Sequence, residues 1–375
     1  MALPPKTWVE VSRAALRHNA RQFKRALGPK TALMVVVKSN AYGHGLSETV
    51  RALRDHTPWF GVDSVPEAIL GLKAAPRARF LVLGASLPTW IGSAARKGIR
   101  LSVSSPEEAA LVARKAPRAT VHLQIETGFT RLGILEKDLP GTLRRLRRAG
   151  TNVEGLFTHY ANIEDTTEHS YARGQLARFR RALDVAETIL GRAVPLPHTA
   201  CSAAAILFPQ THFALARVGV SLYGLWPSKE TLVSARAAGR PLDLRTALTW
   251  KTTVAQVKTV KAGTPVSYGL TERMPRSGKV AVLPVGYWDG YDRGLSSVAT
   301  TLVRGRAAKV LGRVCMNMMM VDVSGIPGVR MGDEAVLIGR QGRGEVRVEH
   351  LAAKIGTINY EVVTRINPTL PRLLV

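Results

Sequence analysis

A regular alternation of short apolar runs with longer amphipathic stretches, through the first 240 residues, most constrains the fold. Eight runs with strand character begin near residues 31, 58, 79, 99, 120, 153, 195 and 213. Helix starts lie between them: segments 64–67 and 105–108 both read Ser-x-x-Glu, the capping-box pattern. Eight strand–helix repeats in a stretch of this length favour a parallel (β/α)8 barrel of the TIM type over an open doubly wound sheet.

The pattern changes after residue 240. β-Branched runs punctuated by glycine and proline replace the helical spacing, for example at 252–257, 279–285 and 334–338. This sequence pattern is typical of a mostly β domain. We therefore expect an α/β protein with a (β/α)8 barrel over residues 1–240 and a mostly β C-terminal domain over 241–375. Segment 234–240 is the expected linker.

Composition excludes several classes of protein. The chain has 46% hydrophobic and 21% charged residues, as globular proteins do, and no apolar stretch approaches the ~20 residues of a membrane span. The first six residues lack the apolar core of a secretion signal, so we expect a cytoplasmic location. Two cysteines make neither a disulfide framework nor a four-ligand metal site, and we expect no metal.

The formal net charge of +26 would suit a nucleic-acid partner if the charge were focused on one face. The arginines of segments 144–148 and 173–181 instead interleave with leucine and phenylalanine at helical spacing. That spacing predicts the solvated faces of amphipathic helices. We therefore expect neither nucleic acid nor a membrane as a partner.

Lys38 stands at the end of the apolar run 35–37, and a turn containing Tyr42 and closely spaced glycines follows it. Desolvation disfavours an ammonium group at the end of a buried strand unless the group is paired, neutralised or covalently used. Such lysines often form Schiff bases. For an isolated lysine, the commoner explanation is a side chain that extends along apolar surface to water.

Further polar and glycine-bearing positions follow the later apolar runs. They are Arg131 after the fifth run, His159 at the end of the sixth, Ser202 after the seventh, and Arg217, Gly219 and Val220 in the last. Barrel enzymes carry their chemistry on the loops after the C-terminal ends of the strands, so this distribution predicts one active site. Taken singly, each position also has a structural explanation, such as a surface arginine or a hydrogen-bonded core histidine.

Taken together, these segments resemble those of the alanine racemase family, whose members use pyridoxal 5'-phosphate (PLP). Segment 35–45 resembles the PLP-lysine motif, 215–224 the Arg-x-Gly segment, 198–203 the His-x-Ala-Asn-Ser-Ala segment and 357–361 the Thr-Ile-Asn-Tyr-Glu segment. The resemblance implies that Lys38 binds PLP covalently and serves as one of two catalytic bases. It implies contacts to the cofactor phosphate from Tyr42, Ser202, Gly219, Val220 and Tyr360.

The same resemblance gives Arg217 and His159 parts in the chemistry. In the family the arginine faces the pyridine nitrogen of PLP, where it can donate a hydrogen bond but deliver no proton, because its pKa lies above about 12. The ring then stays an incomplete electron sink, which limits transamination. His159, in segment 154–161, matches the histidine that links this arginine to the second base.

Tyr268, in segment 265–269, matches the family's second catalytic base. A phenol with an ordinary pKa near 10 needs nearby cations to act as a base at neutral pH. Inversion at the α-carbon requires this base on the face of the substrate opposite Lys38. In the family the tyrosine comes from the partner subunit, so the resemblance implies a head-to-tail homodimer.

Substrate contacts are implied for Arg131, Tyr287 and Met316, in segments that resemble the family's at 121–133, 286–290 and 312–318. Met316 would supply a backbone contact to the substrate carboxylate.

Three positions depart from the family pattern. Gln124 replaces a lysine that is often carbamylated, while Cys201 replaces an asparagine and Asn317 an aspartate. We expect the amide oxygen of Gln124 to accept a hydrogen bond from Arg131.

The resemblance implies PLP-dependent, two-base racemisation of L-alanine and D-alanine, supplying D-alanine for peptidoglycan. One alternative is a racemase of broader amino-acid range, because the three departures lie near the expected site. Another is a non-catalytic PLP-binding protein. A fold-related PLP decarboxylase would normally carry an acidic residue in place of Arg217.

Overall fold

The computed structural model describes residues 5–240 and 242–375 and divides into two compact units. The barrel unit comprises Ala15–Ala41 and Thr49–Arg245, and the β unit comprises Tyr42–Glu48, Thr246–Val375 and the residues up to Ala14. The two-segment division expected from sequence did not include these N-terminal contributions to the β unit. Residue 241, where the second domain was expected to begin, lies outside the described residues.

The barrel unit is built on an eight-stranded parallel sheet with the order β8-β7-β6-β5-β4-β3-β2-β9. The strands are β2 (Ala32–Val36), β3 (Trp59–Val62), β4 (Arg79–Val82), β5 (Arg100–Val103), β6 (Thr120–Gln124), β7 (Asn152–Phe157), β8 (Leu196–His198) and β9 (Leu215–Val218). Backbone N–H groups of Arg217 and Ala214 donate to the carbonyls of Ala200 and Pro197, which brings the two end strands together. The sheet therefore curls into a near-closed barrel, and the expected fold class is confirmed.

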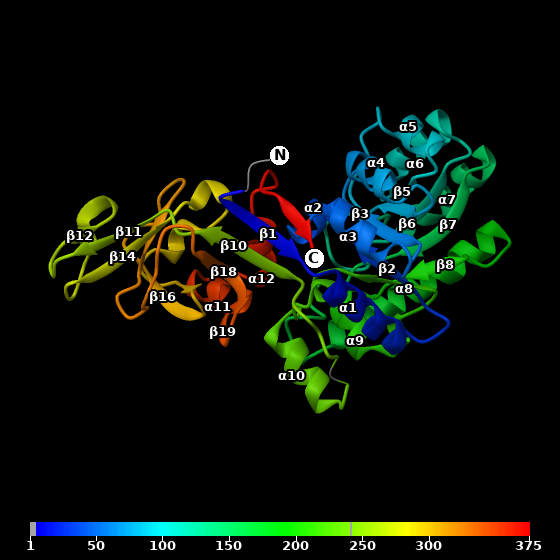
Figure 1. The fold of residues 1–375 in the computed structure, drawn as a ribbon. Helices are drawn as coiled ribbons and strands as arrows, with labels where there is room; N and C mark the ends of the chain where they lie inside the picture. The colour runs from blue at the N-terminus through cyan, green and yellow to red at the C-terminus, as the bar shows by residue number, and fades with distance from the viewer. Residues whose placement is uncertain (1–4, 241) are drawn as a thin grey trace. The chain divides into compact units, whose positions relative to one another are not determined.

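Helices follow the strands around this sheet, as the ribbon of the barrel unit shows (Figure 1). They are α1 (Arg13–Leu27), α3 (Leu46–Leu53), α4 (Val65–Ala74), α5 (Ile91–Arg96), α6 (Pro106–Lys115), α7 (Leu139–Ala149), α8 (Ser170–Leu190), α9 (Ser202–Leu207) and α10 (Lys229–Ala237). Helix α7 buries Leu139, Leu143 and Leu146 and exposes its arginines, as the sequence spacing predicted.

The capping boxes are only half confirmed. At α4 the Ser64 hydroxyl accepts from the Glu67 N–H at 3.5 Å, as predicted. The Glu67 carboxylate, however, accepts from the N–H of Asp63, one residue before the cap, at 2.8 Å. The start of α6 repeats this arrangement, so both carboxylates hold the preceding loop as well as the helix end.

The prediction of a linker at 234–240 was wrong. Helix α10 continues through residue 237, with Ala235 buried and the Ser228 hydroxyl accepting from the Thr231 N–H at 3.0 Å. Alanine and arginine are strong helix formers, so this small-residue segment extends the helix instead of interrupting it.

The β unit contains a ten-stranded sheet with the path β11-β14-β17-β16-β15-β18-β10-β1-β20, and β19 pairs with β18. The strands are β1 (Thr7–Val11), β10 (Leu248–Thr253), β11 (Gln256–Val260), β14 (Gly278–Leu283), β15 (Thr300–Val303), β16 (Arg306–Leu311), β17 (Met319–Asp322), β18 (Glu334–Gln341), β19 (Gly344–Val346) and β20 (Arg372–Leu374). Strands β12 (Pro265–Val266) and β13 (Glu272–Arg273) form a separate pair, and the helices are α11 (Val348–Lys354) and α12 (Asn359–Thr364).

Strand β1 comes from the N-terminal end of the chain and lies between β10 and β20 (Figure 1). It pairs antiparallel with β10 in the register Val9 to Trp250, and parallel with β20 in the register Val9 to Arg372. Strands from both ends of the described chain thus belong to the sheet of the β unit.

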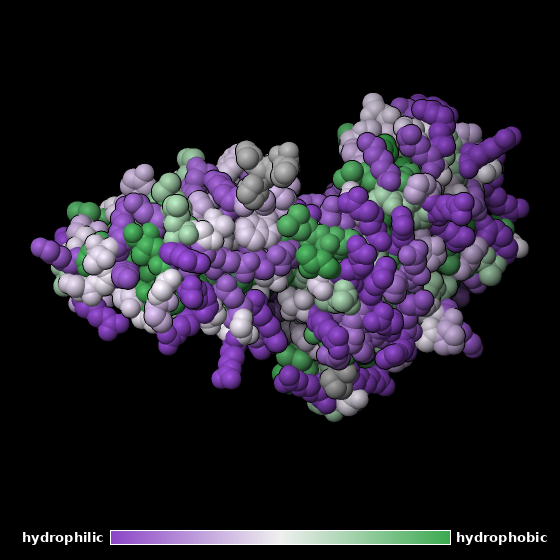
Figure 2. Space-filling model, viewed as in Figure 1, coloured by the Kyte–Doolittle hydropathy of each residue, from purple (hydrophilic) through white to green (hydrophobic). Residues whose placement is uncertain are grey.

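Hydrophilic side chains spread over the face seen in Figure 2, with small hydrophobic patches between them. The exposed arginines of α7 agree with the interpretation of these basic residues as a solvated helix face. None of the helices in the described ranges is both long and apolar enough to cross a lipid bilayer.

A substitution at Gly71 of α4 would test the packing of this helix against the barrel. An alanine Cβ there would lie 2.3 Å from Cε1 of Phe80, a buried ring stacked on Phe60 at 5.4 Å. We expect Gly71→Ala to lower the free energy of unfolding, measured in urea, by about 1–3 kcal/mol. In the control Gly174→Ala, in α8, the nearest atom is 3.7 Å away on a flexible arginine, so we expect stabilisation by about 0.5–1 kcal/mol. Unchanged stability of Gly71→Ala would contradict the packing described.

Candidate active site

Lys38 is half-buried at the C-terminal end of β2, and an unusual turn follows it. The turn α2 (Lys38–Tyr42) has left-handed backbone from Ser39 to Tyr42, with φ between 52° and 55°. Each such non-glycine residue costs about 1–2 kcal/mol, so the surroundings must hold the turn in place. One restraint is visible: the Glu67 carboxylate accepts from the Ser39 N–H at 2.7 Å. The sequence analysis assigned Glu67 only to the cap of α4.

Arg217 lies on β9 and is 5% exposed. Its Nη1 donates to Nδ1 and the backbone oxygen of His198 at 2.6 and 3.0 Å, and its Nη2 donates to the backbone oxygens of Thr158 and Thr199 at 2.7 and 3.1 Å. Burial lowers the Arg217 pKa to about 10, which leaves a cation at neutral pH. Nε–H is the one group of the guanidinium without an acceptor among the described residues.

Three cations act electrostatically on His159. Its Nδ1 lies 3.5 Å from Nη2 of Arg217. Burial, followed by the charges of Arg217, Arg131 and Lys38, lowers the His159 pKa to about 3. His159 is therefore neutral at neutral pH, and the structure brings together four of the side chains singled out from sequence.

The expected hydrogen bond between Gln124 and Arg131 is absent. The Gln124 amide donates to the Leu132 oxygen at 3.0 Å, and its own carbonyl oxygen is buried without a partner in residues 5–240 and 242–375. The Arg131 guanidinium lies over the Phe129 ring, 4.2 Å from its centroid. The prediction failed because the Arg131 guanidinium lies on an aromatic face instead of reaching Oε1 of Gln124.

Ser202 and Gly219, two of the expected phosphate contacts, lie side by side. The Ser202 hydroxyl oxygen accepts from the Gly219 N–H at 3.0 Å. Val220 follows at the start of a short 3-10 helix, η3 (Val220–Tyr223). Cys201 is the residue before α9 and makes no side-chain cap, whereas an asparagine there could cap the helix.

Tyr268, Tyr287 and Met316 lie on three loops of the β unit that hydrogen bonds hold together. The Ser267 hydroxyl donates to the Arg313 oxygen at 2.6 Å, and the Tyr287 N–H donates to the Cys315 oxygen at 3.0 Å. Tyr268 is 73% exposed. We call the exposed side chains of these loops the tyrosine patch, which comprises Tyr268, Leu270, Tyr287, Trp288, Met316 and Met318.

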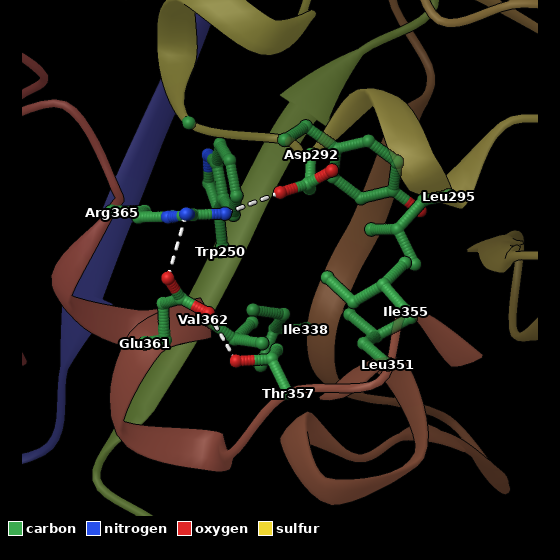
Figure 3. Close-up of a pocket in the computed structure, with 12 residues that line it drawn as sticks. Trp250, Asp292, Leu295, Ile338, Leu351, Ile355, Thr357, Glu361, Val362 and Arg365 are labelled. Carbon is green, nitrogen blue, oxygen red and sulfur yellow. Dashed lines mark hydrogen bonds and ion pairs between the residues drawn. The ribbon is translucent and has the colours of Figure 1, made fainter. Parts of the chain in front are cut away.

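The expected phosphate-binding tyrosines form a pair in the β unit, where the rings of Tyr42 and Tyr360 lie 6.1 Å apart. Helix α12 carries Tyr360 and is anchored by Arg365, which bonds to Asp292 and to Glu361, each at 2.6 Å (Figure 3). These ion pairs border a cavity with apolar walls that include Trp250, Ile338 and Leu351 (Figure 3). The sequence analysis did not identify Arg365, although its i,i+4 spacing from Glu361 is a recognisable signal.

Two family models match the sequence: alanine racemase, N-terminal domain, over residues 11–227, and alanine racemase, C-terminal domain, over residues 247–374. The chain belongs to the alanine racemase family. Curated alanine racemases include those of Leptospira interrogans, 36% identical over 98% of this chain and 96% of the relative, and of Desulforamulus reducens, 38% identical over 98% of each.

Solved structures of the family share the fold. The alanine racemase of Bacillus anthracis with bound L-Ala-P has a TM-score of 0.91 at 32% identity, covering 100% of this chain and 96% of that one. The alanine racemase of Streptomyces lavendulae has a TM-score of 0.89 at 34% identity, covering 100% and 98%. The barrel and the β unit are therefore those of alanine racemases.

The neutral state of His159 predicts a pH dependence of stability. The folded chain protonates this residue only near pH 3, whereas the ordinary pKa is 6.5. Between these values the unfolded state binds more protons, so stability falls as the pH is lowered, by up to about 1.4 kcal/mol per pH unit for this one residue. We expect His159→Gln to make this decline shallower in urea unfolding of the apoprotein across that window. The exposed histidine variant His350→Gln should keep the wild-type slope, and an equally steep decline in His159→Gln would contradict the assignment.

Proposed function

We propose that the protein interconverts L-alanine and D-alanine with PLP as cofactor and with Lys38 and Tyr268 as the two catalytic bases. The observation that carries this proposal is the cluster of Lys38, Arg131 and Arg217 around a neutral His159 in the barrel unit. Family membership supports the same reaction. D-Alanine for peptidoglycan and a cytoplasmic location are further parts of the proposal that rest on the family and the sequence alone.

The barrel residues fit PLP. The Arg217 guanidinium is held by acceptors on every side except at Nε–H, which suits a ring nitrogen that can only accept. The Ser202 hydroxyl and the Gly219 N–H are polar groups for the phosphate, and Val220 follows them in the chain. Tyr42 and Tyr360 of the β unit are proposed as phosphate contacts from the family resemblance alone. PLP, when bound, supplies an electron sink that stabilises negative charge at the substrate α-carbon.

Lys38 holds the cofactor and, once its amine is released, moves a proton at the α-carbon. Arg131 is proposed to hold the alanine carboxylate, since a guanidinium matches a carboxylate with two parallel hydrogen bonds. Tyr287 and Met316 would add contacts from the β unit.

Tyr268 needs a partner to act as a base. In the single chain its side chain is 73% exposed, whereas a phenol that acts as a base at neutral pH needs cations close to it. The tyrosine patch around it exposes several large apolar side chains on one set of loops, as protein–protein interfaces do. We infer a head-to-tail homodimer in which the patch of one subunit completes the barrel site of the other.

A racemase of broader range is the second candidate. The partnerless carbonyl of Gln124 and the position of Arg131 over Phe129 are specific reasons to test it, because both lie beside the proposed carboxylate contact. A chiral assay of PLP-loaded protein against L-alanine, L-serine, L-lysine and L-arginine separates the two. Comparable turnover of several substrates would favour the broader activity, and PLP binding without turnover would favour a non-catalytic PLP-binding protein.

We expect Lys38→Ala to lose both the visible absorbance of covalently held PLP and racemisation of alanine, because it removes the amine proposed to bond the cofactor. The measurements are the absorbance spectrum after gel filtration and a chiral assay. Lys30→Ala, an exposed-lysine control, should keep both. Racemisation by Lys38→Ala without added amines would refute the role of Lys38.

Tyr268→Phe should slow exchange of the α-hydrogen of L-alanine with solvent far more than that of D-alanine, because Lys38 removes the proton from the D-enantiomer. The kcat/KM for racemisation must fall equally in both directions, since the enantiomers have equal free energy. Initial deuterium incorporation into each enantiomer is therefore the informative measurement. Equal slowing of the two exchanges would remove the assignment of Tyr268 as the base specific for L-alanine.

The origin of Tyr268 can be tested by mixing subunits. If Tyr268 acts on the partner's Lys38, a heterodimer of Lys38→Ala and Tyr268→Phe subunits has one complete site. Random pairing of co-expressed subunits should then restore about a quarter of wild-type activity. If both bases act within one chain, every site is defective and the mixture stays inactive.

A further inference from the structure

A chain of hydrogen bonds leads away from the buried Arg217 through two buried histidines to the half-buried Glu154. Nη1 of Arg217 lies 2.6 Å from Nδ1 of His198, and Nε2 of His198 lies 2.8 Å from Nδ1 of His122. Nε2 of His122 lies 3.1 Å from Oε2 of Glu154, which also accepts from Nε of Arg100 at 3.1 Å. The chain spans five strands and ends at a carboxylate that the proposed mechanism does not use.

The direction of every hydrogen bond follows from its ends. Arginine can only donate, so Nδ1 of His198 accepts and Nε2 of His198 carries the proton. That proton makes Nδ1 of His122 an acceptor, and Nε2 of His122 then donates to Glu154. An ionised carboxylate only accepts, so the two ends of the chain demand the same tautomer of both histidines.

The charges agree with this assignment. Burial, with the charge of Arg217, lowers the pKa of His198. Burial also lowers the pKa of His122, against the opposing effect of Glu154. Burial opposes ionisation of Glu154, but hydrogen bonds from His122 and Arg100 lower its pKa to about 2. Two neutral rings therefore separate a buried cation from a half-buried anion.

The local sequence leaves room for these rings. A Cβ at Gly155 would lie 2.2 Å from Nδ1 of His122, so only glycine permits this position of the ring. The Phe157 ring stacks on His198 at 4.9 Å with an interplanar angle of 5°. Both residues belong to β7, the strand that carries Glu154. Strand β7 thus holds the two histidines in three ways. Glu154 accepts the hydrogen bond from His122, Gly155 leaves room for the His122 ring, and Phe157 packs on the His198 ring.

We propose that Glu154 is a positioning residue for the reaction: through His122 and His198 it fixes the tautomers that hold the Arg217 guanidinium with its Nε–H free. The inference rests on the proposed function, because the consequence for catalysis depends on Arg217 facing the cofactor. If either histidine adopted the other tautomer, two N–H groups would oppose each other within the chain. Arg217 would then lose its 2.6 Å bond to His198 and its fixed orientation.

The first test needs no cofactor. In apoprotein labelled with 15N-histidine, long-range 1H–15N correlation spectra at neutral pH should show His122 and His198 as single Nε2–H tautomers. Glu154→Gln replaces an acceptor-only carboxylate with an amide that either accepts or donates. We expect a mixture of tautomers at His122 and a shifted Nδ1 resonance at His198, which Glu154 does not touch. A wild-type Nδ1–H tautomer of either ring, or an unchanged His198 in Glu154→Gln, would overturn the proposal.

The second test uses the PLP-loaded protein. Glu154→Gln should lower kcat for alanine by about 10- to 100-fold, a size typical of misplacing a reacting group from a distance, with KM little changed. Glu108→Gln is the matched control, because Glu108 also accepts hydrogen bonds beside a barrel strand but has no link to Arg217. A lower unfolding temperature without the kcat effect would reduce Glu154 to a structural role.

The two tests also separate this inference from the proposed function. Failure of wild-type protein to bind PLP or racemise alanine would refute the function while leaving the tautomers measurable. Normal racemisation by Glu154→Gln, with disturbed tautomers, would refute the positioning role and leave the function intact.

Discussion

The arrangement of the barrel interior depends on burying one cation. A guanidinium taken out of water must find acceptors for its N–H groups, because an unpaired buried charge costs several kcal/mol. Arg217 finds three backbone oxygens and the ring of His198. Those acceptors come from the ends of β7 and β8, so the residues that satisfy the arginine also set the positions of His159 and Ser202 nearby.

The sequence predicted the parts of the fold that depend on local pattern. The eight barrel strands were visible because each is a short apolar run between amphipathic helices, and α7 was visible from the spacing of its leucines. The pairing of β1 with β10 was not visible, because five residues of strand character contain no information about a partner more than 200 positions away. The end of α10 was missed because small residues suit both helix and linker.

In the candidate site, too, local sequence pattern was predictive and contacts between distant residues were not. Residues within motifs, such as Lys38 and Arg217, could be chosen from sequence. The interactions between them could not, because they depend on side-chain geometry across strands. His122 and Glu154 stand on neighbouring strands at unremarkable sequence positions, and only the barrel brings them within hydrogen-bonding distance. Gln124 illustrates the converse, since its amide oxygen was expected to accept from Arg131 but has no partner among the described residues, while its amide nitrogen donates to Leu132.

Electrostatics explain why the two ends of the barrel interior differ. The charges that act on His159 are all positive, from Arg217, Arg131 and Lys38. The carboxylate of Glu154 is separated from them by two neutral imidazole rings and is already paired with Arg100. It orients the arginine without neutralising the group of cations. Like charges in a protected site repel each other until an anion enters, and both a phosphate and an amino-acid carboxylate are anions. A site of this construction therefore gains most from ligands that carry negative charge at two separate points, as PLP and alanine do together.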